Sequence, residues 1–105
     1  MKLEIPFNEW SRGRLLTGYK IATTRNKKYG YIGDTFEVEL GEPTGKKEYI
    51  MIAVFPHMLR KVAYDLFFIE GANSPSEFID VWKEIHPRAG WTPEKMVWVH
   101  IFKQK

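Results

Sequence analysis

Four polar side chains that could carry chemistry lie close together between residues 18 and 25. Lys20 and Arg25 supply positively charged donors that suit phosphate or carbonyl oxygens. Thr23 and Thr24 supply hydroxyl groups, and a threonine hydroxyl can attack or orient a substrate when a nearby amine takes its proton. A polar edge strand with solvated charges would use the same residue types, so this cluster by itself leaves both interpretations open.

Glu70 is the acidic residue with the most unusual position. It lies four residues after Leu66 and seven after Ala63, so a helix extending this far would turn the carboxylate toward its apolar face. Gly71 is expected to end that helix, where the negative end of the helix dipole disfavours a carboxylate. Burial and the dipole would favour the protonated acid, whereas a cation such as Lys20 would favour the charged form, and such opposition is typical of functional sites. A buried structural ion pair is the alternative.

Basic and aromatic residues alternate in the loop that follows the polar cluster. This mixture suits base stacking beside phosphate contacts, although ordinary loop tyrosines would look the same. In a second loop, residues 87–93, Trp91 is a candidate for the rim of a pocket or, alternatively, for a plug in the core. The candidate ligand-binding residues are Lys20, Thr24, Arg25, Lys27, Lys28, Tyr29, Tyr31 and Trp91.

The elements that must position these residues follow from the hydrophobic pattern. Residues 35–40 alternate apolar and acidic side chains, which predicts a half-buried strand. Residues 49–55 are apolar on both faces, which predicts a strand covered on both sides, and residues 96–102 predict a closing strand.

Three helices are predicted, one before these strands and two between the second and third of them. The first spans residues 7–16 and ends before Gly18, and the second carries its apolar stripe from Leu59 to Leu66. The third begins at the capping box Ser74-Pro75-Ser76-Glu77 and continues with apolar residues at helical spacing. This order predicts an α+β domain with a mostly antiparallel sheet, most simply a small closed barrel with flanking helices.

The composition is that of an ordinary folding sequence of 105 residues, 44% apolar and 28% charged. We expect one domain over residues 1–105, since the chain can close one hydrophobic core and contains no linker or repeat. The longest apolar run, residues 50–56, is far shorter than the roughly 20 residues that cross a bilayer, and no secretory signal is visible. A cytoplasmic protein is therefore expected, and we expect a monomer.

Metal chemistry is disfavoured, because the sequence has no cysteine and its three histidines lack the spacing of metal ligands. No metal and no cofactor are expected. The net charge of +3 is concentrated between Arg12 and Lys28, a stretch without an acidic residue. Such a distribution favours polyanionic partners, among them RNA.

Taken in order along the chain, these residues resemble the ASCH domain family of the PUA-like superfamily. The resemblance implies a β-barrel whose cleft holds the lysine, the threonine and the glutamate, with a role in binding RNA or nucleotides. It rests on Phe7 and the following helix, Gly18-x-Lys20-x-x-Thr23-x-Arg25, Gly33-Asp34, Glu70-Gly71, Phe78, Trp82 and a terminal strand ending in Phe102.

Some bacterial proteins similar to this family are small amidohydrolases that cleave the acetyl amide of N4-acetylcytidine. The resemblance to them implies Lys20 as base, Thr23 as nucleophile and Glu70 as proton shuttle. Ile21 stands where those enzymes usually have threonine, Thr24 where they usually have an apolar residue, and a regular strand would place Lys20 and Thr23 on opposite faces. RNA or nucleotide binding is thus the first prediction, deacetylation of a modified nucleoside the alternative, and a protein-interaction module the second alternative.

Overall fold

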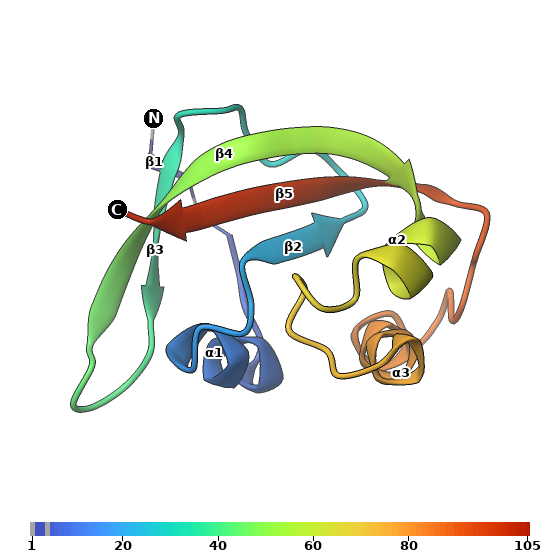
Figure 1. Ribbon diagram of the computed structural model, residues 1–105, viewed down its shortest axis with the longest axis horizontal. Coiled ribbons are helices and arrows are strands. Elements are labelled where there is room, and N and C mark those ends of the chain that lie inside the picture. The colour runs from blue at the N-terminus through green and yellow to red at the C-terminus, as the bar shows by residue number, and fades with distance from the viewer. Residues whose placement is uncertain (1, 4) are drawn as a thin grey trace.

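A five-stranded sheet forms the frame of the fold in the computed structural model, which describes residues 2–3 and 5–105 (Figure 1). The strands follow the order β1-β3-β4-β5-β2, and every neighbouring pair is antiparallel except the parallel pair of β1 and β3. Their bounds are β1 Lys2–Leu3, β2 Ala22–Arg25, β3 Thr35–Glu39, β4 Lys46–Met58 and β5 Met96–Gln104. The mostly antiparallel α+β architecture predicted from the sequence is confirmed.

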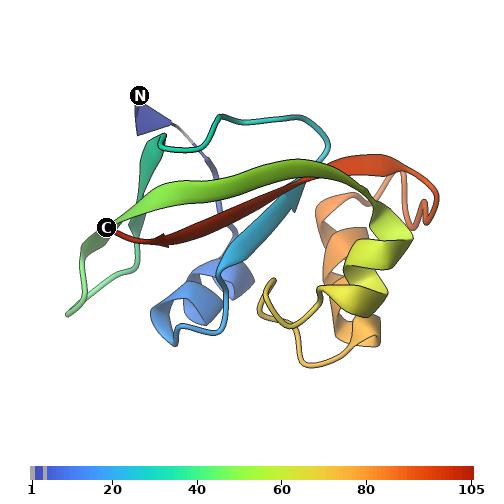
Figure 2. The same cartoon turned by 45° about the horizontal axis from the view of Figure 1, so that its top comes forward.

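The sheet curls strongly but does not close. Figures 1 and 2 show the two longest strands, β4 and β5, arching over the helices, which lie on the concave side. The register between these strands shifts between Met51 and Ala53, and a bulge of this kind bends a strand and increases its twist. Where a closed barrel was expected, β1 and β2 remain the two edges of the sheet in the part of the chain that the structure describes.

The two faces of the sheet are covered unequally. On β3, Phe36 and Val38 are buried and Glu39 is exposed, as the alternation predicted. On β4, Tyr49 and Met51 are buried, but the next residue, Ile52, keeps 45% of its surface exposed. The prediction that this strand is covered on both sides is wrong at that point, because all three helices lie on one side of the curled sheet (Figures 1 and 2).

Two hydrophobic clusters flank the strand β5, which contributes to both. The first packs the helical face against Val97 and Val99, and the second gathers aromatic rings around Phe102. In that second cluster the rings of Phe36 and Phe102 meet edge to face with centroids 5.1 Å apart. Full burial of side chains of this size contributes about 1.5–3 kcal/mol each, so the two clusters hold the sheet and the helices together.

The helix α1, Glu9–Leu16, begins two residues later than the predicted start at residue 7. Its N-cap is Asn8, whose side-chain oxygen accepts a hydrogen bond from the Ser11 backbone N–H at 2.8 Å. Asparagine is among the best N-cap residues, so the helix starts where this bond becomes available. Gly18, with a φ of 80°, turns the chain away after the helix, as expected.

The helix α3, Pro75–Ile85, confirms the predicted capping box in its main part. The Ser74 hydroxyl oxygen accepts from the Glu77 backbone N–H at 3.1 Å, and proline occupies the first turn. The Glu77 carboxylate accepts from the Asn73 N–H at 2.8 Å. The remaining helix, α2, spans Leu59–Asp65. No helix in the described ranges, 2–3 and 5–105, has the length and apolar character to span a membrane.

Candidate functional site

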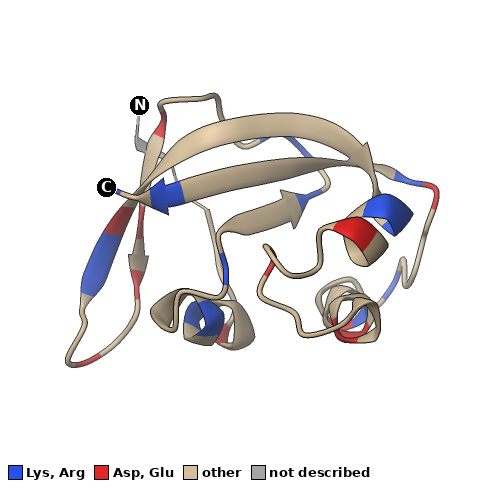
Figure 3. Cartoon of the chain, viewed as in Figure 1, with Lys and Arg blue, Asp and Glu red and all other residues tan. Residues whose placement is uncertain are grey.

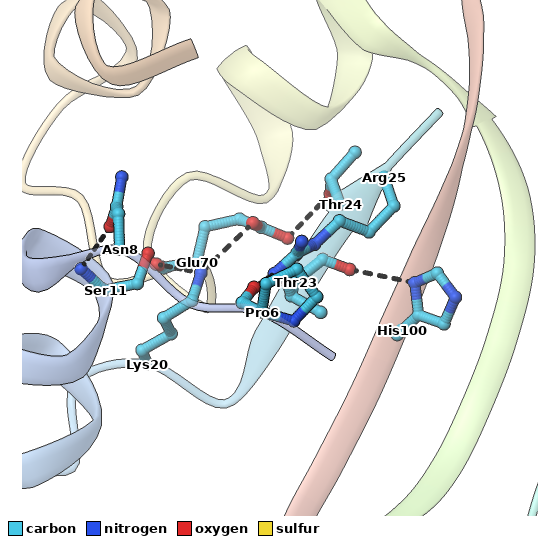
Figure 4. A network of polar contacts seen from close by, with 9 residues as sticks. All are labelled: Pro6, Asn8, Ser11, Lys20, Thr23, Thr24, Arg25, Glu70 and His100. Carbon is cyan, nitrogen blue, oxygen red and sulfur yellow. Dashed lines mark hydrogen bonds and ion pairs between the residues drawn. The ribbon is translucent and has the colours of Figure 1, made fainter. Parts of the chain in front are cut away.

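The centre of the site is a buried ion pair between segments that are far apart in the sequence. Lys20 lies between α1 and β2, Glu70 lies between α2 and α3, and their backbones form an isolated antiparallel bridge. The Lys20 ammonium donates to the Glu70 backbone carbonyl at 3.1 Å and lies 3.6 Å from Oε1 of its carboxylate (Figure 4). Both side chains are buried, so each charge depends on the other for compensation.

Glu70 faces the interior as expected, but not from the end of a helix. The helix α2 ends at Asp65, and the chain then turns back so that the Ile69 carbonyl accepts from the backbone N–H groups of Ile21 at 2.8 Å and Ala22 at 3.0 Å. Residues 66–69 form a turn, and Glu70 then pairs with Lys20 just before β2 in the isolated bridge. The predicted position at a helix C-terminus is wrong, because these backbone bonds replace the last turns of the helix.

The two threonines of β2 have different partners. The Thr24 hydroxyl donates to Oε2 of the Glu70 carboxylate at 2.8 Å, whereas the Thr23 hydroxyl accepts from Nε of Arg25 at 2.9 Å (Figure 4). Successive residues of a strand point to opposite faces, which separates the two hydroxyls. The structure thus brings Lys20, Glu70 and Thr24 into one polar cluster and places the hydroxyl of Thr23 beside the guanidinium of Arg25.

Arg25 joins β2 to the segment that precedes α1. Its Nη2 donates to the Pro6 carbonyl at 2.5 Å, and its guanidinium lies over the rings of Phe7 and Tyr29, at 5.1 and 5.6 Å from their centroids. A guanidinium combines planar hydrogen bonding with stacking on aromatic faces. Arg25 therefore builds a wall of the site and fixes the aromatic rings beside it.

Burial sets the protonation behaviour of the amine at the centre. It lowers the pKa of Lys20 below the ordinary value of 10.5, the Glu70 carboxylate opposes this shift, and the charge of Arg25 adds to it. A lowered pKa favours the neutral amine, which is the form of lysine that can accept a proton.

His100 supports β2 from the neighbouring strand and is fully buried. Its Nε2 accepts from the Tyr29 backbone N–H at 3.0 Å, so Nδ1 carries the proton and donates to the Thr23 carbonyl at 3.1 Å. Both bonds suit the neutral ring, and burial lowers the pKa of His100 below its ordinary 6.5. The imidazole is therefore a structural support that tolerates protonation poorly.

Acid is expected to destabilise the protein through His100. Between the lowered pKa of the folded protein and the ordinary pKa of 6.5, the unfolded chain binds more protons at this ring than the folded protein does. The free energy of unfolding should therefore decrease as the pH is lowered, by at most about 1.4 kcal/mol per pH unit from this group. Urea unfolding between pH 5.5 and 7.5 measures the slope. The His100→Gln variant, which has no titrating ring, should show a flatter slope than the His86→Gln control, and equal slopes would contradict this assignment.

A cavity of about 540 Å³ opens beside the polar cluster, within the size range of small-molecule sites. Residues of α1, β2, α3 and the turn carrying Glu70 all line it. Its polar lining comprises mainly Lys20, Thr23, Thr24, Arg25, Asn26, Lys27 and Glu70, and its aromatic lining comprises Phe7, Trp10, Tyr29, Phe78 and Trp82. A largely apolar hollow with a few convergent polar groups is the usual form of a ligand site.

Three other residues that the sequence suggested as ligand contacts lie outside the cavity lining. Lys28 and Tyr31 lie outside the lining, with the ammonium 3.9 Å from the Tyr31 ring centroid and 5.4 Å from that of Trp98. Trp91 is half-buried and packs against the hydrophobic cluster of α2 and α3, and it is absent from the cavity lining. Within the described ranges no group of three histidine, aspartate or glutamate side chains is placed to hold a metal ion.

The tryptophans of the helices have a role at the cavity that their spacing does not reveal. Trp82 belongs to the buried core cluster, as expected for the apolar face of α3, and together with Trp10 it also lines the cavity. Helical spacing shows which face of a helix is apolar, but it cannot show whether that face meets other side chains or an open hollow.

This fold, a curled antiparallel sheet with its helices on the concave side, is an ASCH-like fold of the PUA-like type. Two solved structures share it: an ASCH domain from Lactobacillus crispatus and an Enterococcus faecalis protein of the family DUF984. The first is 15% identical with a TM-score of 0.65 and the second 16% identical with a TM-score of 0.66; each alignment covers 98% of this chain and 77% of the other. No family model and no curated protein matches the chain by sequence. The resemblance noted in the sequence is confirmed at the level of the fold.

Proposed function

We propose that the cavity binds one unpaired base of a single-stranded RNA, or the corresponding modified nucleoside. The observation that carries the proposal is the cavity itself, in which aromatic walls enclose a buried group of hydrogen-bonding side chains, Lys20, Thr24 and Glu70. Sequence-specific recognition of RNA commonly stacks a splayed-out base on aromatic rings and hydrogen-bonds its edge. An ammonium donor beside a carboxylate acceptor can read such an edge.

A basic and aromatic surface continues from the mouth of the cavity and favours a polyanionic ligand. Arg25 in the lining pairs directly across the strands with Trp98, and Lys28 lies over the ring of Trp98. Figure 3 marks positively charged residues in blue at the end of β2 and in the loop after it, and the sequence has no acidic residue there until Asp34, just before β3. We call Lys27, Lys28, Tyr29, Tyr31 and Trp98 the rim. Phosphates would meet its ammonium groups and flanking bases its rings.

Removing the two lysines of the rim should weaken RNA binding and reduce its salt dependence. Each phosphate contact to single-stranded nucleic acid contributes roughly 0.7 to the slope of log affinity against log salt concentration. The Lys27→Ala/Lys28→Ala variant should therefore lose up to about 1.4 of that slope. Fluorescence anisotropy with a labelled oligoribonucleotide between 50 and 200 mM salt measures it.

The Lys46→Ala/Lys47→Ala variant is the matched control, because it removes the same charge from the distant start of β4. It should keep most of the wild-type slope. Equal losses in the two variants would mean that general charge, and not the rim, attracts the RNA.

A second candidate is hydrolysis of the acyl amide of an N4-acylated cytidine, favoured by the lowered pKa of the buried Lys20. In the proposed reaction Lys20 takes the proton of a threonine hydroxyl, and the threonine oxygen attacks the amide carbonyl. The bond between the carbonyl carbon and N4 then breaks, N4 takes that proton from the Lys20 ammonium, and cytidine leaves with its neutral amino group. Water then hydrolyses the acyl ester and restores the hydroxyl. Glu70 moves protons between these groups.

Comparing Thr23→Val with Thr24→Val tests which hydroxyl such a reaction uses. The motif assigns attack to Thr23, whereas the bond to Glu70 favours Thr24. Loss of the nucleophile should lower turnover of N4-acetylcytidine by at least about 10²-fold, a typical contribution of such a group. Chromatographic detection of cytidine measures turnover. No cytidine from the wild type at high protein concentration would remove the enzymatic candidate and leave binding intact.

A further inference from the structure

The helix α3 presents a row of rings to the cavity. Phe78, Trp82 and His86 follow each other at intervals of four residues, and all three line the cavity. The rings of Phe78 and Trp82 are near-parallel with centroids 6.2 Å apart, and those of Trp82 and His86 are near-parallel at 4.1 Å. The apolar stripe of α3 therefore forms a column of stacked rings along one wall of the site, as well as part of the core.

Trp82 carries a hydrogen-bond donor that the protein leaves unused. Its side chain is only 4% exposed, and its indole N–H makes no hydrogen bond to any residue in the described part of the chain. The neighbouring imidazole stacks on the indole ring, and its Nδ1 bonds the Trp82 backbone carbonyl at 3.1 Å, but it makes no hydrogen bond to the indole N–H. A buried donor without a partner costs free energy, so native proteins rarely keep one without a reason.

We propose that the Trp82 indole N–H donates a hydrogen bond to an acceptor atom of the ligand in the cavity. The ligand is then a planar ring that bears a carbonyl oxygen or a ring nitrogen, and it rests against the wall formed by Phe78, Trp82 and His86. This inference rests on the proposed function and adds the residue that selects the ligand. Ligands that lack an acceptor would leave the donor unpaired and bind weakly, as happens in sites built to hydrogen-bond their substrate.

The decisive experiment removes the donor and preserves the shape of the ring. Trp82 is replaced by β-(3-benzothienyl)alanine, in which sulfur stands in place of the indole N–H, and Trp82→Phe serves as a simpler second variant. The probes are cytidine, N4-acetylcytidine and a short single-stranded oligoribonucleotide, with affinity measured by calorimetric titration. The same sulfur-containing replacement at Trp91, which is half-buried against the same hydrophobic cluster and is absent from the cavity lining, is the matched control.

The isosteric replacement at residue 82 should raise the dissociation constant of the probes that bind by about 5- to 100-fold, and the control should change it little. Without ligand, its melting temperature should equal or exceed that of the wild type, since no hydrogen bond of the free protein is lost. Unchanged affinity, or a clear loss of melting temperature in the free protein, would overturn the inference alone. A wild-type protein that binds none of the probes would overturn the proposed function and this inference with it.

Discussion

Replacing Lys20 by methionine is expected to abolish most ligand binding and to lower the free energy of unfolding by about 3–5 kcal/mol. The loss arises because the Glu70 carboxylate stays buried while the ammonium that lies 3.6 Å from it is gone. Glu70→Gln should destabilise the protein for the converse reason, although the amide oxygen can still accept from Thr24. Losses of this size are a large part of the free energy of unfolding of an ordinary domain, which is about 5–15 kcal/mol.

The double variant Lys20→Met/Glu70→Gln separates a structural ion pair from a functional one. With both charges removed, no uncompensated charge remains in the interior, so the double variant should be clearly more stable than the sum of the two single losses predicts. Ligand binding should nevertheless stay lost, because the donor and the charged acceptor are both absent. Urea unfolding and calorimetric titration of the same four proteins give the two readouts.

Two results would contradict this assignment. Additive losses of stability would show that the two side chains do not depend on one another. Ligand affinity restored in the double variant would show that the pair serves the fold alone and that recognition lies elsewhere in the cavity.

Gly71→Ala is expected to have the second large effect, because this glycine lies where two segments of the site meet. Its φ of 94° already disfavours any side chain, a strain of about 1–3 kcal/mol. An added Cβ would also meet Cβ of Arg14 at 2.9 Å and Cβ of Lys20 at 3.1 Å. These neighbours lie close to their own backbones, so relief requires moving α1 away from the turn that carries Glu70. We expect a further loss of about 1–3 kcal/mol from this crowding.

Gly18→Ala is the matched control for the crowding. Gly18 has a similar φ of 80°, but a Cβ there would meet nothing within 4 Å. The melting temperature of Gly18→Ala should therefore fall only because of the backbone strain. That of Gly71→Ala should fall further, by about 4–8 °C for each additional 1 kcal/mol of lost stability. Gly71→Ala should also weaken ligand binding, since Lys20 is displaced. Equal melting temperatures of the two variants would show that the close approach at Gly71 does not constrain the site.

Local sequence patterns predicted much of the fold because the forces that create them are local. The capping residues of α3 and the alternation of β3 are visible without any knowledge of distant contacts, and both were found as expected. The end of α2 differs from the prediction, because it depends on hydrogen bonds that the backbone N–H groups of Ile21 and Ala22 donate to the Ile69 carbonyl. These hydrogen-bonding residues lie far apart in the sequence, whereas a helical pattern shows only contacts between residues a few positions apart.

The candidate site shows the same division. Spacing and composition indicated Lys20 and Glu70 as unusual residues, and their proximity follows from the bridge that joins their backbones. That Thr24 and not Thr23 bonds the carboxylate depends on how β2 is oriented against the turn at Glu70. A strand offers both faces, and its sequence alone does not show which face a distant acid will approach.

The sequence by itself therefore determined the start of α3, the alternation of β3, the basic character of the loop after β2 and the identity of the charged residues. Each of these features depends on residues that lie within a few positions of one another in the sequence. Only the tertiary structure decided that the sheet curls without closing, that the apolar face of α3 lines a cavity, and that the Trp82 N–H has no hydrogen-bond partner among the residues that the structure describes, 2–3 and 5–105. These properties depend on which surfaces of distant segments meet, and hydrophobic burial favours contact without specifying the partner.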